Sequence, residues 1–167
     1  MSDHARDSSS IRVTLSELSR QEAADAQSEL LGTQHILLAF LGDYENSAAR
    51  ILSSYAVTRE KAEAAIKQVM AEGVCETQKR STDAESKTAA LADQKPSTEQ
   101  ASQAFRKGSL EVIKRRDPVA VWAHILLGLL MVEEGIAAKS LAALDLDFHQ
   151  LRTSIFKLLD SPEVPVP

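Results

Sequence analysis

The sequence predicts an all-α fold made of two copies of one four-helix unit, packed as a pseudo-symmetric pair. The main observation is an internal repeat: residues 35–41, His-Ile-Leu-Leu-Ala-Phe-Leu, return at 124–130 as His-Ile-Leu-Leu-Gly-Leu-Leu, displaced by 89 residues. The displacement holds without a gap to residue 159, with ten identities in 36 aligned positions. A second observation is that no segment alternates apolar and polar residues as a strand does. A repeat of this kind fixes the architecture before any motif is considered.

Cap residues divide the first unit into four helices, because side chains that accept hydrogen bonds from free amides mark helix starts. The first predicted helix runs from the capping box Thr14-Leu15-Ser16-Glu17 to about Leu31 and is stopped by Gly32. A short second helix is capped by Thr33. The third covers about Ser47–Tyr55 and is capped by Asn46, and the fourth is capped by Thr58. The run Ile36–Leu41 is apolar on every side, which places its helix in the middle of a bundle.

The second unit repeats this order. Its predicted helices are one starting at Pro96-Ser97 with Gln100 and reaching about Arg115; one capped by Asp117 with Pro118 in the first turn; one of about Ile136–Leu144 after Gly135; and one capped by Asp147.

These patterns divide the chain into five segments. We expect a flexible tail (1–13), a first repeat (14–71), a polar linker (72–96), a second repeat (97–160) and a Pro-rich tail (161–167). The linker predicts a marginal helix around Glu85–Ala92 at most.

Composition excludes several function classes. Apolar residues make up 44 % of the 167 residues but aromatics only 4 %, so the core is aliphatic. The net charge of −5 argues against general binding to nucleic acid or membrane surfaces, which needs a strongly basic face. Cys75 is the only cysteine, and its acidic neighbours do not favour a reactive thiolate. With no signal segment in the sequence, we expect a cytoplasmic protein.

The repeated motif resembles the Clp N-terminal repeat, a double motif at the front of Clp-family protein unfoldases. The first copy reads Gly-Thr-Gln-His-Ile-Leu-Leu over residues 32–38, and the second contains Glu-Glu-Gly-Ile-Ala-Ala-Lys-Ser-Leu over residues 133–141. In that family the domain is a docking platform for substrates and adaptors. The resemblance therefore implies partners such as a Clp ATPase, the Clp protease core, or a substrate or adaptor protein.

The sequence contains no Gly-x-x-x-x-Gly-Lys-Ser/Thr phosphate loop. It also shows no Ser–His–Asp arrangement, so we expect neither catalytic residues nor a cofactor, and we predict that the chain is not an enzyme.

The resemblance also suggests candidate partner-binding residues. In some of these domains, a Glu between Thr and His of each repeat receives the guanidinium of phosphorylated arginine. The corresponding positions here are Gln34 and Ala123, preceded by Thr33 and Trp122. Because a charge-assisted bidentate contact needs the carboxylate, phosphoarginine binding by this route is not expected. The four residues remain candidates for contact with a partner.

Other clusters have a structural and a functional interpretation. His35 and His124 indicate either a symmetric metal or proton site or, as we favour, a hydrogen-bonded histidine in each repeat. Trp122 suits a core or an interface equally. The basic residues Arg106, Lys107 and 114–116 favour a solvated helix end over a face that docks an acidic partner.

Carboxylates at Glu22, Asp25 and Glu29 favour an exposed helix face over acid–base chemistry. They give no reason to revise the prediction of a non-enzymatic protein.

Three functions follow from this sequence. The first is a stand-alone accessory or adaptor protein of a Clp system. The second is the substrate-receiving N-domain of a longer Clp ATPase. The third is a sensor that sequesters a small molecule or a modified residue in the groove between the repeats.

If the two apolar runs form the core, replacing Leu37 or Leu126 by Ala removes buried methyl groups and leaves a cavity. The free energy of unfolding, measured by urea denaturation, is then expected to fall by roughly 2–5 kcal/mol for each variant. A loss below about 1 kcal/mol would place that side chain outside the core.

Overall fold

The computed structural model describes residues 8–42, 46–77, 96–117 and 122–161. Within these ranges the chain forms eight helices and no β-strand. The helices are α1 (Ser8–Asp25), α2 (Thr33–Gly42), α3 (Ser47–Ser54), α4 (Arg59–Ala71), α5 (Glu99–Arg115), α6 (Trp122–Leu130), α7 (Ile136–Ala143) and α8 (Phe148–Leu159). No described helix is both long and apolar enough to span a membrane. The all-α prediction is confirmed.

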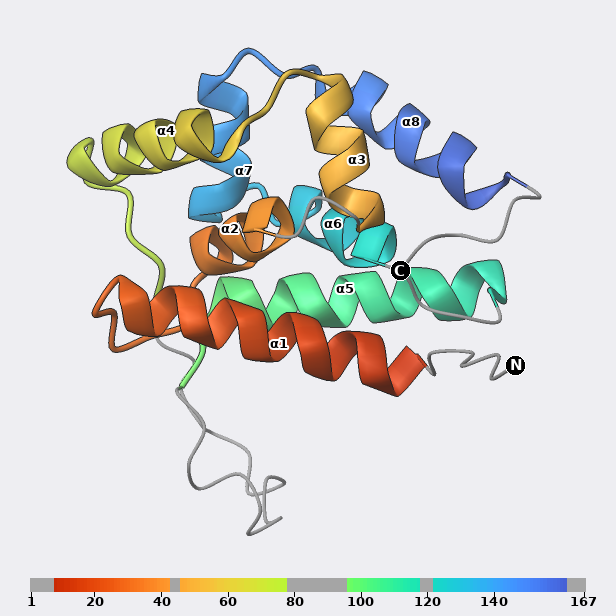
Figure 1. Ribbon diagram of the computed structural model, residues 1–167, viewed down its shortest axis with the longest axis horizontal. Coiled ribbons are helices and arrows are strands. Elements are labelled where there is room, and N and C mark those ends of the chain that lie inside the picture. Colours follow the sequence, from red (N-terminus) through yellow and green to blue (C-terminus); the bar gives the residue numbers. More distant parts are fainter. Residues whose placement is uncertain (1–7, 43–45, 78–95, 118–121, 162–167) are drawn as a thin grey trace, which may run out of the picture.

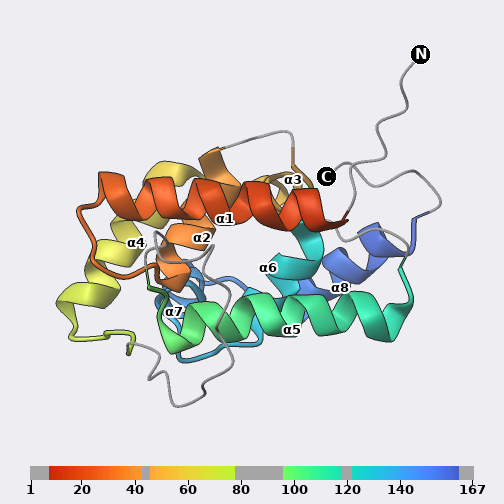
Figure 2. The same ribbon diagram turned by 90° about the horizontal axis from the view of Figure 1, so that it is seen from below.

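The two halves of the chain interlock. α2 and α6 lie in the middle, α1 and α5 run along one side, and the remaining four helices cover the other side (Figures 1 and 2). α1 packs on α2, and α5 packs mainly on α6 with a smaller contact to α2. By contrast, α4 packs on α7, and α3 contacts both α6 and α8. The halves therefore share one core.

The central helices are the most deeply buried elements. All nine residues of α6 are buried, as are seven of the ten residues of α2. Leu37 and Leu126 are both fully buried. This agrees with the expectation that the two apolar runs form helices in the middle of the bundle. Burying such helices supplies most of the hydrophobic free energy of a bundle that has few aromatic residues.

Backbone geometry reproduces the sequence repeat. Gln27 and Arg116 have φ of 53° and 55°, and Ala56 and Asp145 have φ of 58° and 57°. Each pair is separated by 89 residues, the displacement found in the sequence. Each of these residues follows a helix, and the next amide bonds back across the last turn, as from Ser28 N to Ala23 O at 2.8 Å. Such left-handed caps usually use Gly, and none of these four positions is Gly, so local sequence patterns do not predict them.

The predicted bounds of the first helix are wrong at both ends. It begins at Ser8, so Thr14 lies inside the helix and the capping box is not its start. It ends at Asp25 because Gln27 takes the left-handed cap. The following residues run to Leu31, which forms a parallel bridge with Ser97.

Three of the remaining caps agree with prediction, whereas Thr33, predicted to cap the second helix, is the first residue inside α2. Asn46, Thr58 and Asp147 accept hydrogen bonds from amides of the helices that follow them. The start of α5 is corrected by one residue: Thr98 is its cap, because Ser97 is engaged in the bridge to Leu31. The predicted helix at 85–92 and the first-turn Pro118 lie outside the described residues.

α5 and α6 cross at two glycines. A Cβ at Gly108 would lie 2.8 Å from the carbonyl oxygen of His124, and a Cβ at Gly128 would overlap the backbone of Ala104 and Gly108. The two backbones therefore approach too closely for a side chain on either helix. In the first repeat the position of Gly128 is held by Ala39, so this close crossing belongs to the second repeat alone.

We predict that Gly128→Ala lowers the free energy of unfolding by about 1–3 kcal/mol or more, because α5 must move away from α6. Urea denaturation measures the change. Gly42→Ala is the matched control, since its Cβ would lie 3.4 Å from the flexible end of Arg59. Equal stability of the two variants would contradict the close crossing.

Candidate functional site

The start of α2 is held by hydrogen bonds from both sides. The Nδ1 of His35 accepts from Gly32 N at 2.9 Å, which fixes the turn before the helix. The Thr33 hydroxyl accepts from Ala137 N of α7 at 3.0 Å and donates to the carboxylate of Glu76. Thr33 is fully buried and thus connects the two repeats rather than facing solvent.

Glu76 is the centre of this contact. Its Oε2 accepts from Thr33 N at 2.9 Å and from the Thr98 hydroxyl at 2.6 Å. Its Oε1 accepts from Ile136 N at 2.9 Å and from the Thr33 hydroxyl. We call these five residues, Thr33, Glu76, Thr98, Ile136 and Ala137, the Glu76 junction.

The junction joins the N-terminal ends of three helices to one carboxylate. α2 and α7 each direct a backbone amide at it, and α5 contributes its cap residue, Thr98. Helix N-termini carry partial positive charge and free N–H groups, so a carboxylate is a favourable partner for them. The junction already has its anion, and an external anion would have to displace Glu76.

The equivalent contact in the second repeat is built differently. There Ala123 N of α6 donates to the Ser47 hydroxyl of α3 at 3.0 Å. The position equivalent to Thr33 is Trp122, which has no hydroxyl, so the hydroxyl comes from the opposite helix instead. The Trp122 ring lies 6.0 Å from the ring of Phe40, centroid to centroid, and only 4 % of the residue is exposed. We call this the Ser47 junction.

The structure divides the four predicted partner-binding residues into two pairs. Thr33 belongs to the Glu76 junction and Gln34 follows it on α2, whereas Trp122 and Ala123 lie at the Ser47 junction. The two junctions are separated along α2. Phe40, which Trp122 contacts, lies seven residues beyond Thr33, about 10 Å along the helix axis. Three of the four residues are buried; Gln34 is half-buried, and its Oε1 is buried without a hydrogen-bond partner among the described residues.

Both repeat histidines make internal hydrogen bonds, as we favoured. His35 bonds to Gly32, and His124 Nε2 lies 2.7 Å from Asp117 Oδ2. Burial opposes ionisation of Asp117, but its hydrogen bonds with His124 and Arg115 hold the pKa of the carboxyl below its usual value. No group of three potential metal ligands occurs in the described part of the chain.

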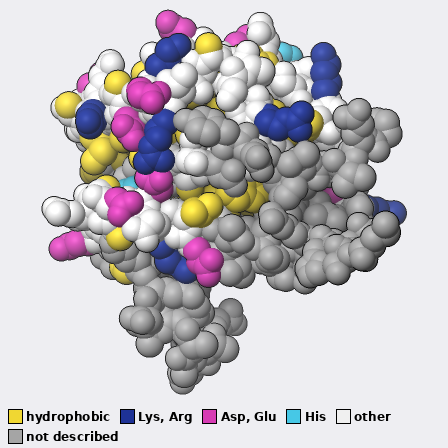
Figure 3. Space-filling view, viewed as in Figure 1, with side chains coloured by type: hydrophobic (Ala, Val, Ile, Leu, Met, Phe, Trp, Pro, Cys, Tyr) yellow, Lys and Arg dark blue, Asp and Glu magenta, His cyan; other side chains and the backbone are white. Residues whose placement is uncertain are grey.

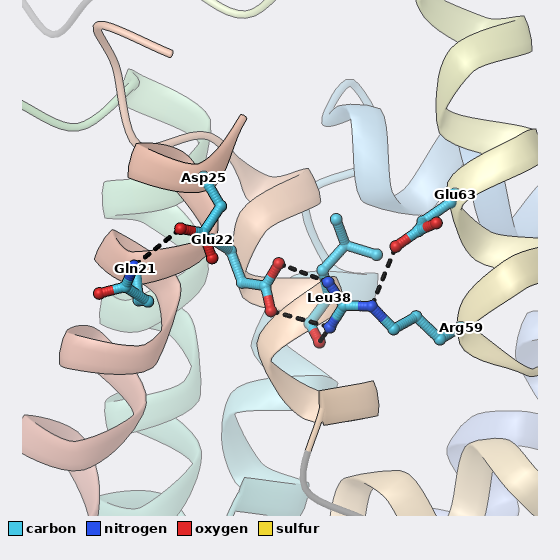
Figure 4. A network of polar contacts seen from close by, with 6 residues as sticks. All are labelled: Gln21, Glu22, Asp25, Leu38, Arg59 and Glu63. Carbon is cyan, nitrogen blue, oxygen red and sulfur yellow. Dashed lines mark hydrogen bonds and ion pairs between the residues drawn. The ribbon is translucent and has the colours of Figure 1, made fainter. Parts of the chain in front are cut away.

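The acidic stripe on α1 is not simply an exposed face. Glu22 forms a bidentate ion pair with Arg59 of α4 at 2.8 and 2.7 Å, and Arg59 also contacts Glu63 and the carbonyl of Leu38 (Figure 4). The hydrogen bond to Glu22 is the main cause that raises the pKa of Arg59 above its ordinary value. Glu22 therefore has a structural role, and Glu29 lies beyond the helix.

The basic residues near the end of α5 are partly neutralised. Arg115 pairs with Asp117 and Asp160, and Lys114 pairs with Glu111. Elsewhere, acidic and basic side chains alternate over the described surface in Figure 3. Cys75 is exposed and directly precedes Glu76, and no described neighbour marks it as a nucleophile.

Comparison with known proteins identifies the family. The family model of the Clp repeat N-terminal domain matches residues 10–94, half of the chain. The chain belongs to this family, as the repeat motif suggested.

Its relatives include much longer proteins. The ATP-dependent Clp protease ATP-binding subunit ClpC of Staphylococcus saprophyticus is 29 % identical over 145 residues, and that of Staphylococcus aureus strain USA300 is 27 % identical over the same length. Each alignment covers 87 % of this chain but 16 % of the relative.

A solved structure shares the fold. The N-terminal domain of the chaperone ClpD from Arabidopsis thaliana superposes with a TM-score of 0.63 at 18 % identity, covering 89 % of this chain and 92 % of that domain. The similarity thus extends through both repeats.

We predict that Glu76→Gln lowers the free energy of unfolding by about 1–3 kcal/mol. A side-chain amide has one accepting oxygen where the carboxylate has two, and it carries no negative charge to interact with the helix N-termini. Glu72→Gln is the control: it lies four residues away on an exposed position and bonds only to Gln68 within the described residues, so a change within about 0.5 kcal/mol is expected. Urea denaturation of both variants measures the difference, and equal effects would remove the special role of Glu76.

Proposed function

We propose that this chain is a non-enzymatic protein-binding module of a Clp chaperone–protease system, which docks a substrate or adaptor protein. The observation that carries the proposal is family membership together with an alignment that covers most of this chain and only a sixth of ClpC. The relatives named ClpC are ATP-binding subunits, and this sequence contains no phosphate loop of its own. Binding without hydrolysis is the activity that such a module can supply, and we place it in the cytoplasm.

The module acts either in trans, as an accessory protein, or in cis, as the N-domain of a longer ATPase. Both modes agree with an alignment that covers 16 % of ClpC. Of the four residues predicted to face a partner, Gln34 keeps exposed surface, whereas Thr33, Trp122 and Ala123 are buried and would be reached only if a junction opened.

A chimera separates the two modes. The chain is fused to a ClpC ATPase that lacks its own N-domain, and degradation of an unfolded model protein by the assembled protease is measured. We expect fusion to restore degradation toward the rate given by the native N-domain, which is the positive control. The unfused chain, added to intact ClpC, is expected to change the rate if it acts in trans. No effect in either format would overturn the proposal.

A further inference from the structure

One face of α5 is both apolar and basic. Leu110 and Ile113 are 46 % and 71 % exposed, although they lie on a helix whose opposite face is buried against α6. Arg106, Lys114 and Arg116 are exposed beside them. We call these five residues the α5 face. Figure 2 shows α5 along one edge of the molecule, on the side away from α1.

The spacing of this face suits a partner helix. Arg106, Leu110 and Ile113 follow at i, i+4 and i+7, so they form one ridge along the outside of α5. Helices pack by placing such ridges into each other's grooves. A single exposed Leu is ordinary on a protein surface, but here two large apolar residues occupy successive turns of the same ridge.

The charge of the face is opposite to that of the chain. Over residues 106–117 there are five basic and two acidic residues, whereas the whole chain carries −5. Both acids already have partners: Glu111 pairs with Lys114, and Asp117 pairs with Arg115 and His124. Arg106 and Arg116 form no ion pair within the described residues. The uncompensated charge on this face is positive.

The C-terminal end of α5 is held to α8. The guanidinium of Arg115 lies 5.7 Å from the ring centroid of Phe156 on α8, and Phe156 is 37 % exposed. Arg115 also pairs with Asp160 at 2.5 Å, so the ends of α5 and α8 are held together.

We propose that the α5 face docks an acidic amphipathic helix of a partner protein. Leu110 and Ile113 would contact its apolar stripe, and Arg106 and Arg116 would pair with carboxylates on either side. Charge pairing at the rim of such a contact sets the choice of partner and the rate of association. The inference rests on the proposed docking function and specifies its surface and the chemistry of its partner.

The test uses a fluorescein-labelled helical peptide of about 16 residues, with Leu on one stripe and Glu elsewhere, and a counterpart with Lys in place of Glu. Fluorescence anisotropy measures binding to the full chain. We expect the acidic peptide to bind at least about tenfold more tightly than the basic one, and to weaken as salt screens the charges. Equal binding of the two peptides would overturn the proposal.

Variants locate the contact. Ile113→Ser and Arg106→Glu are expected to weaken binding of the acidic peptide by at least about tenfold each, since one removes apolar contact and the other reverses a charge. Met70→Ser, at a residue of α4 that is 50 % exposed, and Arg50→Glu, at an exposed residue of α3, are the matched controls. All four residues are exposed, so circular dichroism is expected to show native helix content. Loss of binding only in the controls would place the site elsewhere and overturn the proposal.

Two further results distinguish docking of an acidic helix on the α5 face from self-association and from the proposed docking function itself. Sedimentation velocity is expected to show a monomer; a dimer that Ile113→Ser dissociates would make the α5 face a self-interface and contradict an acidic partner. In the ClpC chimera, full activity with Arg106→Glu together with unchanged peptide binding would reject the α5 face and leave the docking function standing. An inactive chimera whose α5 face still binds the acidic peptide would reject the function alone.

Discussion

The arrangement of the helices depends on one carboxylate. Glu76 accepts two backbone amides, from Thr33 and Ile136, and two hydroxyls, from Thr33 and Thr98. Without such a partner, the N-terminal ends of α2, α5 and α7 would meet with like partial charges and with unpaired N–H groups. Because α2 belongs to the first repeat and α5 and α7 to the second, the carboxylate also fixes how the repeats are joined. It sets the chain path as well: Glu99 N bonds to Thr77 O at 2.8 Å, so the segment that follows α4 meets the start of α5 beside the junction.

Duplication produced two junctions that have since diverged. The second repeat has Trp122 where the first has Thr33, and it compensates with the hydroxyl of Ser47 and with the packing of the indole on Phe40. The first repeat carries the Glu22–Arg59 ion pair, whereas the position equivalent to Arg59 is Phe148. The second repeat instead brings α5 close to α6 through two glycines. In the described residues this pseudo-symmetric fold thus presents two different outer faces, of which the α5 face is the apolar and basic one.

Sequence reasoning found the architecture because the repeat of 35–41 at 124–130 is both apolar and exact in register. It found Asn46, Thr58 and Asp147 because their side chains cap by a short-range rule. It missed the end of α1 because Gln27 takes a left-handed conformation that Gly usually takes. It missed Glu76 for a different reason: this residue stands in a polar linker, and its four partners come from residues between 22 and 60 positions away. No local pattern reports contacts of that range.

At the candidate site, too, the sequence motif could not reveal three-dimensional contacts. The motif identified Thr33 and Trp122 as equivalent positions, which they are, but it could not show that both are buried. The most direct test of the central role of Glu76 is amide hydrogen exchange in the wild type and in Glu76→Gln. If Glu76 holds the helix ends, the amides of Thr33 and Ile136 exchange at least about tenfold faster in the variant, while the amide of Ala123, which bonds to Ser47, keeps its exchange rate. Unchanged exchange at Thr33 and Ile136, or an equal increase at Ala123, would contradict it.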